Sequence, residues 1–212
     1  MQRRPPILCL VTDRRMAPDG RFVRVIAEAV TGGVDMVQLR EKDLPVRQQI
    51  ALAEELRAAV AGMAVIVVND RLDVALAAGL QGVHLGEQSL PVAAAVRTAG
   101  GRLLVGRSVH DAKSAKQAEA DGASYLIAGH IFATASHPNE PPRGLQLIGD
   151  VRAAVGCALL AIGGITPANA AECIRAGADG VAVISPIMAA ARPAEAARRI
   201  KEVIRAAEVR TP

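Results

Sequence analysis

His130 is well placed in this sequence to move protons. It follows a short apolar run at residues 125–129, typical of a buried strand, and precedes a proline-containing loop that continues to Gly144. A long loop in a compact domain often covers or binds a ligand. The pKa of an imidazole is close to neutral pH, so His130 could accept a proton from a substrate and return it. A structural, hydrogen-bonded histidine is the alternative interpretation.

Other polar side chains follow apolar runs and could bind a substrate. Gln38, Arg40 and Lys42 alternate along one run and its exit, so their side chains can share one face. His110 stands at a predicted helix start, where capping is as good an interpretation as ligand contact. His84 lies between two apolar residues and is predicted to be a hydrogen-bonded packing residue. The candidate substrate-binding residues are Gln38, Arg40, Lys42, Asn69, Ser108, His110, Thr134 and Ser136.

Two segments could bind a phosphate group. Gly163 and Gly164 form a pair after one apolar run, and paired glycines let backbone N–H groups approach an anion closely. Ile184 and Ser185 end the last run, and a short helix beginning near Pro186 would direct its positive end at the same anion. A simple tight turn is the alternative interpretation of the glycine pair.

Eight short apolar runs alternate with amphipathic segments of helical period and must position these residues. Apolar strands separated by helices indicate a parallel sheet covered on its faces. A glycine precedes every second run, which favours an eight-fold closed sheet over an open doubly wound one. We therefore predict an α/β protein, a single (β/α)8 TIM-barrel domain at residues 1–212, with its site at the carboxyl ends of the strands. The predicted strands are Ile7–Thr12, Met36–Leu39, Val65–Val68, Val83–Leu85, Leu103–Val105, Tyr125–Ala128, Leu159–Ile162 and Val181–Ile184, and the helices include Val46–Val60, Val92–Thr98, Ala112–Ala120, Pro167–Ala176 and Ala194–Ala207.

The composition argues against several classes of protein. Phe22, Tyr125 and Phe132 are the only aromatic residues, too few for modules that stack nucleobases, and the net charge is only +4. We therefore expect no nucleic-acid partner. No apolar run reaches about 18 residues, so no membrane partner is expected. Three cysteines without CxxC spacing indicate buried thiols and a cytoplasmic protein, with a homodimer as its expected assembly.

Motifs spread along almost the whole chain resemble those of the thiamine phosphate synthase/thiazole tautomerase (TenI) superfamily. The resemblance implies a TIM barrel with one of two activities. The synthase joins a pyrimidine diphosphate to a thiazole phosphate with magnesium. The tautomerase moves a proton within the same thiazole phosphate to make the ring aromatic. The motifs are Leu10–Arg14, Val37–Lys42, Asn69–Arg71, Gly82–Gly86, Gly106–His110, Ala161–Pro167 and Gly177–Ser185.

Departures from the synthase pattern favour the tautomerase branch. The synthase pattern after the sixth strand resembles Gly-Pro-x-x-x-Thr-x-Thr-Lys, whereas here His130 stands at the proline and His137 at the lysine. Gln88 stands where the synthase has a magnesium-binding aspartate, and an amide is a poor ligand for that cation. The segment 129–132 instead resembles the Gly-His-x-Phe of the tautomerase, in which the histidine is the acid–base residue.

The sequence therefore predicts a thiazole tautomerase that aromatises a dihydrothiazole carboxylate phosphate through His130, without cofactor or metal. Its partner would be a small thiazole phosphate. Two alternatives stay open. Arg40, Lys42, Asn69 and Asp70 keep the synthase-like pattern, which favours thiamine phosphate synthase. A phosphate cup could also serve a non-catalytic binding protein for thiazole or thiamine phosphate.

Overall fold

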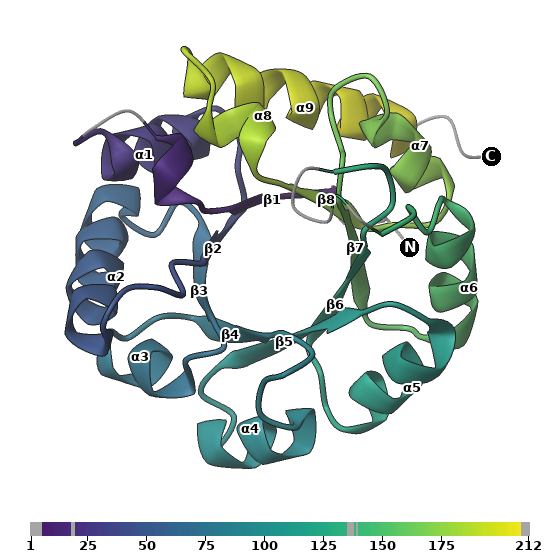
Figure 1. Cartoon of the computed structure of the whole chain (residues 1–212), viewed down its shortest axis with the longest axis horizontal. Helices are drawn as coiled ribbons and strands as arrows, with labels where there is room; N and C mark the ends of the chain where they lie inside the picture. The colour runs from purple at the N-terminus through teal and green to yellow at the C-terminus, as the bar shows by residue number, and fades with distance from the viewer. Residues whose placement is uncertain (1–5, 18–19, 135–137, 139, 209–212) are drawn as a thin grey trace.

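Eight parallel strands form a closed barrel in chain order, with β8 hydrogen-bonded to β1 (Figure 1). The structure, a computed structural model, describes residues 6–17, 20–134, 138 and 140–208. The strands are β1 (Ile7–Val11), β2 (Met36–Leu39), β3 (Val65–Asn69), β4 (Gly82–Leu85), β5 (Leu104–Val109), β6 (Tyr125–Gly129), β7 (Ala158–Ile162) and β8 (Gly180–Val183). The predicted single-domain (β/α)8 barrel is confirmed.

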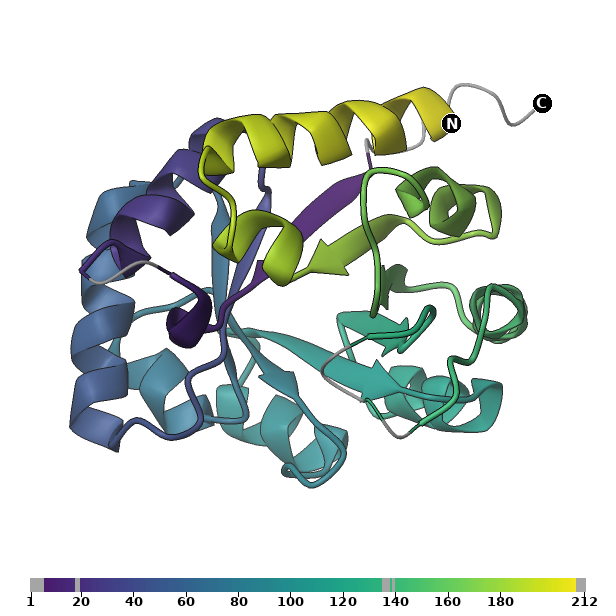
Figure 2. The same ribbon diagram turned by 45° about the horizontal axis from the view of Figure 1, so that its top comes forward.

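Helices between the strands cover the outside of the barrel (Figures 1 and 2). The helix α2 (Val46–Val60) has its predicted bounds: it starts after Pro45 and ends before Ala61, whose φ of 49° is left-handed. None of the described helices is both long and apolar enough to cross a membrane. The other helices are η1 (Arg14–Met16), α1 (Phe22–Thr31), α3 (Leu72–Ala77), α4 (Val92–Ala99), α5 (Ala112–Ala120), α6 (Gln146–Ala154), α7 (Ala170–Arg175), α8 (Ser185–Met188) and α9 (Pro193–Glu208).

The strands separate two apolar layers, because successive side chains of a strand point to opposite faces. Leu8 and Leu10 belong to the large layer between strands and helices, whereas Cys9 and Val11 belong to a smaller cluster that fills the barrel. Burial raises the pKa of the Cys9 thiol to about 12, so Cys9 is a packing group rather than a nucleophile. The interior cluster comprises Cys9, Val11, Met36, Val67, Tyr125, Ile127, Leu160 and Ala182.

A buried ammonium group ties the last helix to the amino end of the barrel. Lys201 of α9 is 5% exposed, and its Nζ donates to the Pro6 carbonyl at 2.6 Å and contacts the Asp35 carboxylate. Asp35 also accepts a 2.7 Å hydrogen bond from the Leu8 amide. One side chain thus joins α9 to the start of β1 and the turn before β2.

The structure corrects the predicted bounds of the fifth strand. The sequence predicted Leu103–Val105, but β5 extends to Val109. Gly106, Arg107 and Ser108 interrupt the apolar pattern because part of the strand faces polar groups inside the barrel and at its carboxyl end. Ser108 therefore lies within a strand rather than in the loop that follows it.

Candidate active site

The predicted binding residues gather at the carboxyl ends of β2, β3 and β5, the end at which barrel enzymes carry their sites. Gln38 is a buried residue of β2, and Arg40 and Lys42 follow that strand as exposed residues. Asn69 is the last residue of β3 and is buried, and Ser108 is a half-buried residue of β5.

A chain of hydrogen bonds joins Gln38, Asn69 and Asp70. Gln38 Nε2 donates to Asn69 Oδ1 at 2.8 Å, and Asn69 Nδ2 donates to Asp70 Oδ2 at 2.6 Å. A carboxylate only accepts, so Asp70 fixes the orientation of both amides. Gln38 Oε1 is left buried, with no hydrogen-bond partner among the described residues. The chain therefore ends in an acceptor held in a fixed direction.

Asp70, which belongs to the synthase-like pattern but was not among the candidate binding residues, is the centre of a polar cluster. Its Oδ1 accepts from the Gly86 amide at 2.9 Å and from the Ser89 hydroxyl, and Lys42 Nζ lies 3.2 Å from its Oδ2. Burial opposes ionisation of this carboxyl group, but the hydrogen bonds from Ser89 and Gly86 and the Lys42 charge outweigh it and lower its pKa. The β4 loop thus brings Ser89 to Asp70, whereas Gln88 is an exposed residue of the turn.

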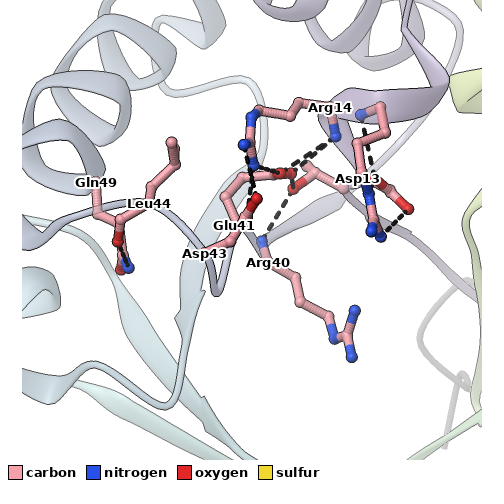
Figure 3. Close-up of polar contacts among 9 residues, drawn as sticks. Asp13, Arg14, Arg40, Glu41, Asp43, Leu44 and Gln49 are labelled. Carbon is pink, nitrogen blue, oxygen red and sulfur yellow. Dashed lines mark hydrogen bonds and ion pairs between the residues drawn. The ribbon is translucent and has the colours of Figure 1, made fainter.

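Glu41 is a buried carboxylate that the sequence analysis also missed, because it stands between two exposed cations. It is 5% exposed and accepts from the Thr12 hydroxyl at 2.7 Å and from the Arg14 amide and guanidinium (Figure 3). The loop after β2 is thereby fastened to the loop after β1. The Arg40 side chain extends away from this cluster, and its guanidinium has no hydrogen bond or ion pair within the described part of the chain.

A cavity of about 410 Å³ lies beside these groups, between the β2 and β3 ends and the start of α2. Three of its lining residues, Lys42, Asn69 and Asp70, belong to the polar network described above. Gln49 of α2 lines it too and donates to the Leu44 carbonyl at 2.8 Å, which holds the loop before the helix. The volume is within the usual range for small-molecule sites.

His84 occupies the barrel interior and is hydrogen-bonded, as the sequence predicted. Its Nδ1 lies 3.2 Å from the Tyr125 hydroxyl, and its Nε2 lies 2.9 Å from Ser108 Oγ. Burial lowers the pKa of His84 to about 3, so the ring is neutral at physiological pH. Gly106 makes space for this arrangement, because a Cβ there would overlap the Tyr125 ring.

His110 links two loops of the site and is not the cap of α5. Asp111 is that cap and accepts from the Ser114 amide at 2.7 Å. His110 Nδ1 contacts the Gly129 carbonyl, and its Nε2 lies 3.2 Å from Glu87. His110 follows β5, so its imidazole connects the loop after β4, which carries Glu87, to Gly129 at the end of β6.

His130 lies directly after β6, as predicted, but it is buried, with 4% of its surface exposed. Its Nε2 donates to the Glu140 carbonyl at 3.3 Å, across the loop that it begins. Thr134 is half-buried in that loop, and the predicted Ser136, like His137, lies outside the described residues.

The predicted phosphate segments lie at the ends of β7 and β8. Gly163 and Gly164 have φ values of 101° and 63°, which favour glycine. A Cβ at Gly163 would overlap His130, and one at Gly164 would overlap the Ala133 carbonyl, so close packing also requires both glycines. Ile184 precedes α8 and Ser185 is its first residue, and β8 leads directly into this short helix (Figure 2).

Proteins of known sequence and structure resemble this chain over nearly its whole length. Thiamine-phosphate synthase of Roseiflexus castenholzii is 42% identical over 93% of this chain and 87% of its own. That of Moorella thermoacetica is 45% identical over 86% of this chain and 88% of its own. A solved structure, thiamine phosphate pyrophosphorylase from Pyrococcus furiosus, has a TM-score of 0.88 and 34% identity and covers 97% of this chain and 98% of its own.

These relatives overturn the tautomerase prediction, because they carry the name of the synthase and not of the tautomerase. The assignment of His130 as the acid–base residue of that reaction falls with it. The prediction gave too much weight to His130 and Gln88. Gln88 is an exposed turn residue, and His130 is buried against the backbone of its own loop. The polar chain from Gln38 to Asp70, in contrast, is fully assembled.

A family model described as thiamine monophosphate synthase matches residues 8–187, which run from β1 into α8. The match includes β1 from Leu8 onward, the other seven strands in full and every predicted site residue. The chain therefore belongs to the thiamine monophosphate synthase family.

Proposed function

We propose that the protein is a thiamine-phosphate synthase, which joins a pyrimidine diphosphate to a thiazole phosphate. The C–O bond between the pyrimidine methylene carbon and the diphosphate breaks, a C–N bond to the thiazole ring nitrogen forms, and pyrophosphate leaves. The names of relatives that are 42% and 45% identical support this activity. The chemistry of the polar groups at the barrel end supports it independently.

The buried, unpaired Oε1 of Gln38 carries the proposal. An unsatisfied buried acceptor costs about 1–3 kcal/mol, which a ligand donor would recover. The amino group of an aminopyrimidine is such a donor, and the Gln38–Asn69–Asp70 chain prevents the Gln38 amide from turning to present its N–H groups instead. We assign Gln38 and Asn69 to the pyrimidine ring.

Cationic groups beside this chain suit the diphosphate. Arg40 has an unengaged guanidinium among the described residues, and Lys42 pairs with Asp70 at the same strand ends. The Ser108 hydroxyl lies on the neighbouring wall of the barrel. Hydrogen bonds to an ionised phosphate oxygen are about twice as strong as hydrogen bonds between neutral groups. We assign Arg40, Lys42 and Ser108 to the diphosphate, with His110 supporting the loops around it.

Asp70 fits a magnesium ion that is held partly by substrate. Such ions use one or two carboxylates together with waters and substrate phosphates. The lowered pKa of Asp70 keeps it ionised, and the Ser89 hydroxyl adjoins it. Within the described ranges, no group of three or more His, Cys, Asp or Glu side chains could hold a metal alone. When bound, the ion would neutralise diphosphate charge. The expectation of no cofactor followed from the tautomerase interpretation and is replaced here.

The thiazole phosphate is assigned to the opposite wall. Gly163 and Gly164 after β7, and Ile184 and Ser185 at the start of α8, offer backbone N–H groups to its phosphate. Thr134 of the β6 loop, and Ser136 from outside the described residues, complete the proposed set.

Product formation from both substrates tests the proposal. With magnesium present, mass spectrometry should detect thiamine phosphate only when both substrates are added, and chelation should abolish the product. In Gln38→Leu, kcat/KM for the pyrimidine diphosphate should fall about 10- to 100-fold, the cost of one hydrogen bond with its buried partners. The exposed change Gln117→Leu on α5 should leave both kcat and KM unchanged. Absence of product, or full activity of Gln38→Leu, would contradict the proposal.

A further inference from the structure

Tyr125, His84 and Ser108 form a continuous hydrogen-bonded line from the apolar interior of the barrel to its carboxyl end. The Tyr125 hydroxyl lies 3.2 Å from His84 Nδ1, and His84 Nε2 lies 2.9 Å from Ser108 Oγ. Tyr125 and His84 are 5% and 2% exposed, whereas Ser108 is half-buried. Only the serine end of the line is open to a ligand.

The surroundings fix the direction in which each proton points. Tyr125 belongs to the interior apolar cluster, and within the described residues His84 Nδ1 is the one hydrogen-bond partner of its hydroxyl. If His84 carried its proton on Nδ1, the phenol proton would have no acceptor, at a cost typical of a buried unsatisfied donor. The Tyr125 hydroxyl therefore donates to Nδ1, and the single proton of the neutral imidazole lies on Nε2.

This direction determines what Ser108 can offer a ligand. Because Nε2–H donates to Ser108 Oγ, the serine hydroxyl proton is directed elsewhere. The charges that act on His84 are the Asp70 carboxylate and the three cations Arg107, Arg40 and Lys42. The three cations are therefore close enough to this end of the barrel to attract an anion.

We propose that Tyr125 and His84 are positioning residues that hold the Ser108 hydroxyl as a hydrogen-bond donor toward an anionic phosphate oxygen of the substrate. Neither residue touches the substrate. The inference rests on the proposed function only for the identity of the anion, the diphosphate that this reaction releases as pyrophosphate.

A double-mutant cycle on binding of inorganic pyrophosphate, measured by calorimetry with magnesium, tests the coupling. Ser108→Ala should weaken binding about 10- to 100-fold, the range for a hydrogen bond to a charged group. Tyr125→Phe should weaken it about three- to tenfold when Ser108 is present, and not at all when residue 108 is alanine. A merely structural role for Tyr125 would give the same loss in both backgrounds, and that result would overturn the proposal, as would a wild type that does not bind pyrophosphate.

The ring nitrogens of His84 give a second readout that does not depend on any ligand. Nitrogen-15 NMR of the histidines, with His84 assigned by its loss in His84→Gln, should show Nε2 protonated and Nδ1 as an acceptor. Protonation on Nδ1 would contradict the proposed direction. The two proposals fail separately. If thiamine phosphate forms but the effects of Tyr125→Phe and Ser108→Ala are independent, the synthase activity stands and the positioning role is wrong. If the two effects are coupled but no thiamine phosphate forms, the positioning role stands and the synthase activity is wrong.

Discussion

The pH dependence of stability should report the burial of His84 directly. Burial lowers the pKa of the folded imidazole to about 3, whereas an unfolded histidine has a pKa of about 6.5. Between these values the unfolded chain binds a proton that the folded chain does not bind. The free energy of unfolding therefore falls as the pH is lowered through 6.5, and it recovers as the pH is raised.

The size of the effect follows from the two pKa values. At pH 5 the His84 contribution costs about 2 kcal/mol of stability relative to pH 7, since each pKa unit corresponds to about 1.4 kcal/mol. His84→Gln keeps a neutral polar side chain and removes the titration. Whatever the variant costs at pH 7, the difference in stability between it and the wild type should shrink by about 2 kcal/mol at pH 5.

Urea denaturation followed by circular dichroism at pH 5, 6 and 7 measures this difference. Tyr125→Phe is the matched control, because it removes the hydroxyl partner but leaves His84 buried, and burial is the main cause of the shift. The control should keep the pH dependence of the wild type. Equal pH dependence in the wild type and His84→Gln would refute the reasoning, because it would mean that the folded imidazole titrates like an unfolded one.

Two further changes test the packing around the site. Lys201→Met should lower the free energy of unfolding by about 1–3 kcal/mol, because Asp35 and the Pro6 carbonyl lose a buried cationic partner. This range is lower than for a fully buried ion pair, since Asp35 is partly exposed to solvent. Exposed Arg198→Met on the same helix should change it by less than about 0.5 kcal/mol, and equal losses would argue against the tie. Gly106→Ala should cost about 1–3 kcal/mol by overlap with Tyr125, and less of that cost should remain in a Tyr125→Leu background. The free energies of unfolding of these variants are measured by urea denaturation. If Gly106→Ala costs as much in the Tyr125→Leu background as in the wild type, the overlap with Tyr125 is not the cause of the loss.

The barrel could be predicted from the sequence because both of its signals are local. Apolar runs and helical periodicity are set by which faces of each element are buried, as α2 shows with its predicted bounds. β5 was the least accurate strand, since Arg107 and Ser108 face polar groups that only the closed barrel assembles. A search for apolar runs in the sequence does not detect the part of a strand whose side chains face polar groups.

The candidate site could be located but not fully assembled from sequence. Gln38, Arg40, Lys42 and Asn69 were selected because they end strands, and the structure places them together. Glu41, Ser89 and Tyr125 were missed because their importance depends on partners far along the chain. Tyr125, for example, contacts a histidine 41 residues away.

The choice of branch failed for a related physical reason. His130 and Gln88 differ from the synthase pattern, and each difference was interpreted separately. The residues of a ligand site act together, however, because they contact one another. Asp70 is linked to Lys42, Asn69 and Ser89 irrespective of the residue at position 88. A set of hydrogen-bonded residues at one end of the barrel is stronger evidence for a ligand than two single differences from the synthase pattern are against it.

The ratio of the two products tests the central claim most directly. Purified protein should be given magnesium, the pyrimidine diphosphate and the thiazole phosphate, with pyrophosphate and thiamine phosphate measured in the same reaction. We predict one pyrophosphate for each thiamine phosphate, and neither product when either substrate is omitted. Pyrophosphate release that is independent of the thiazole phosphate, or no thiamine phosphate at all, would contradict the assignment.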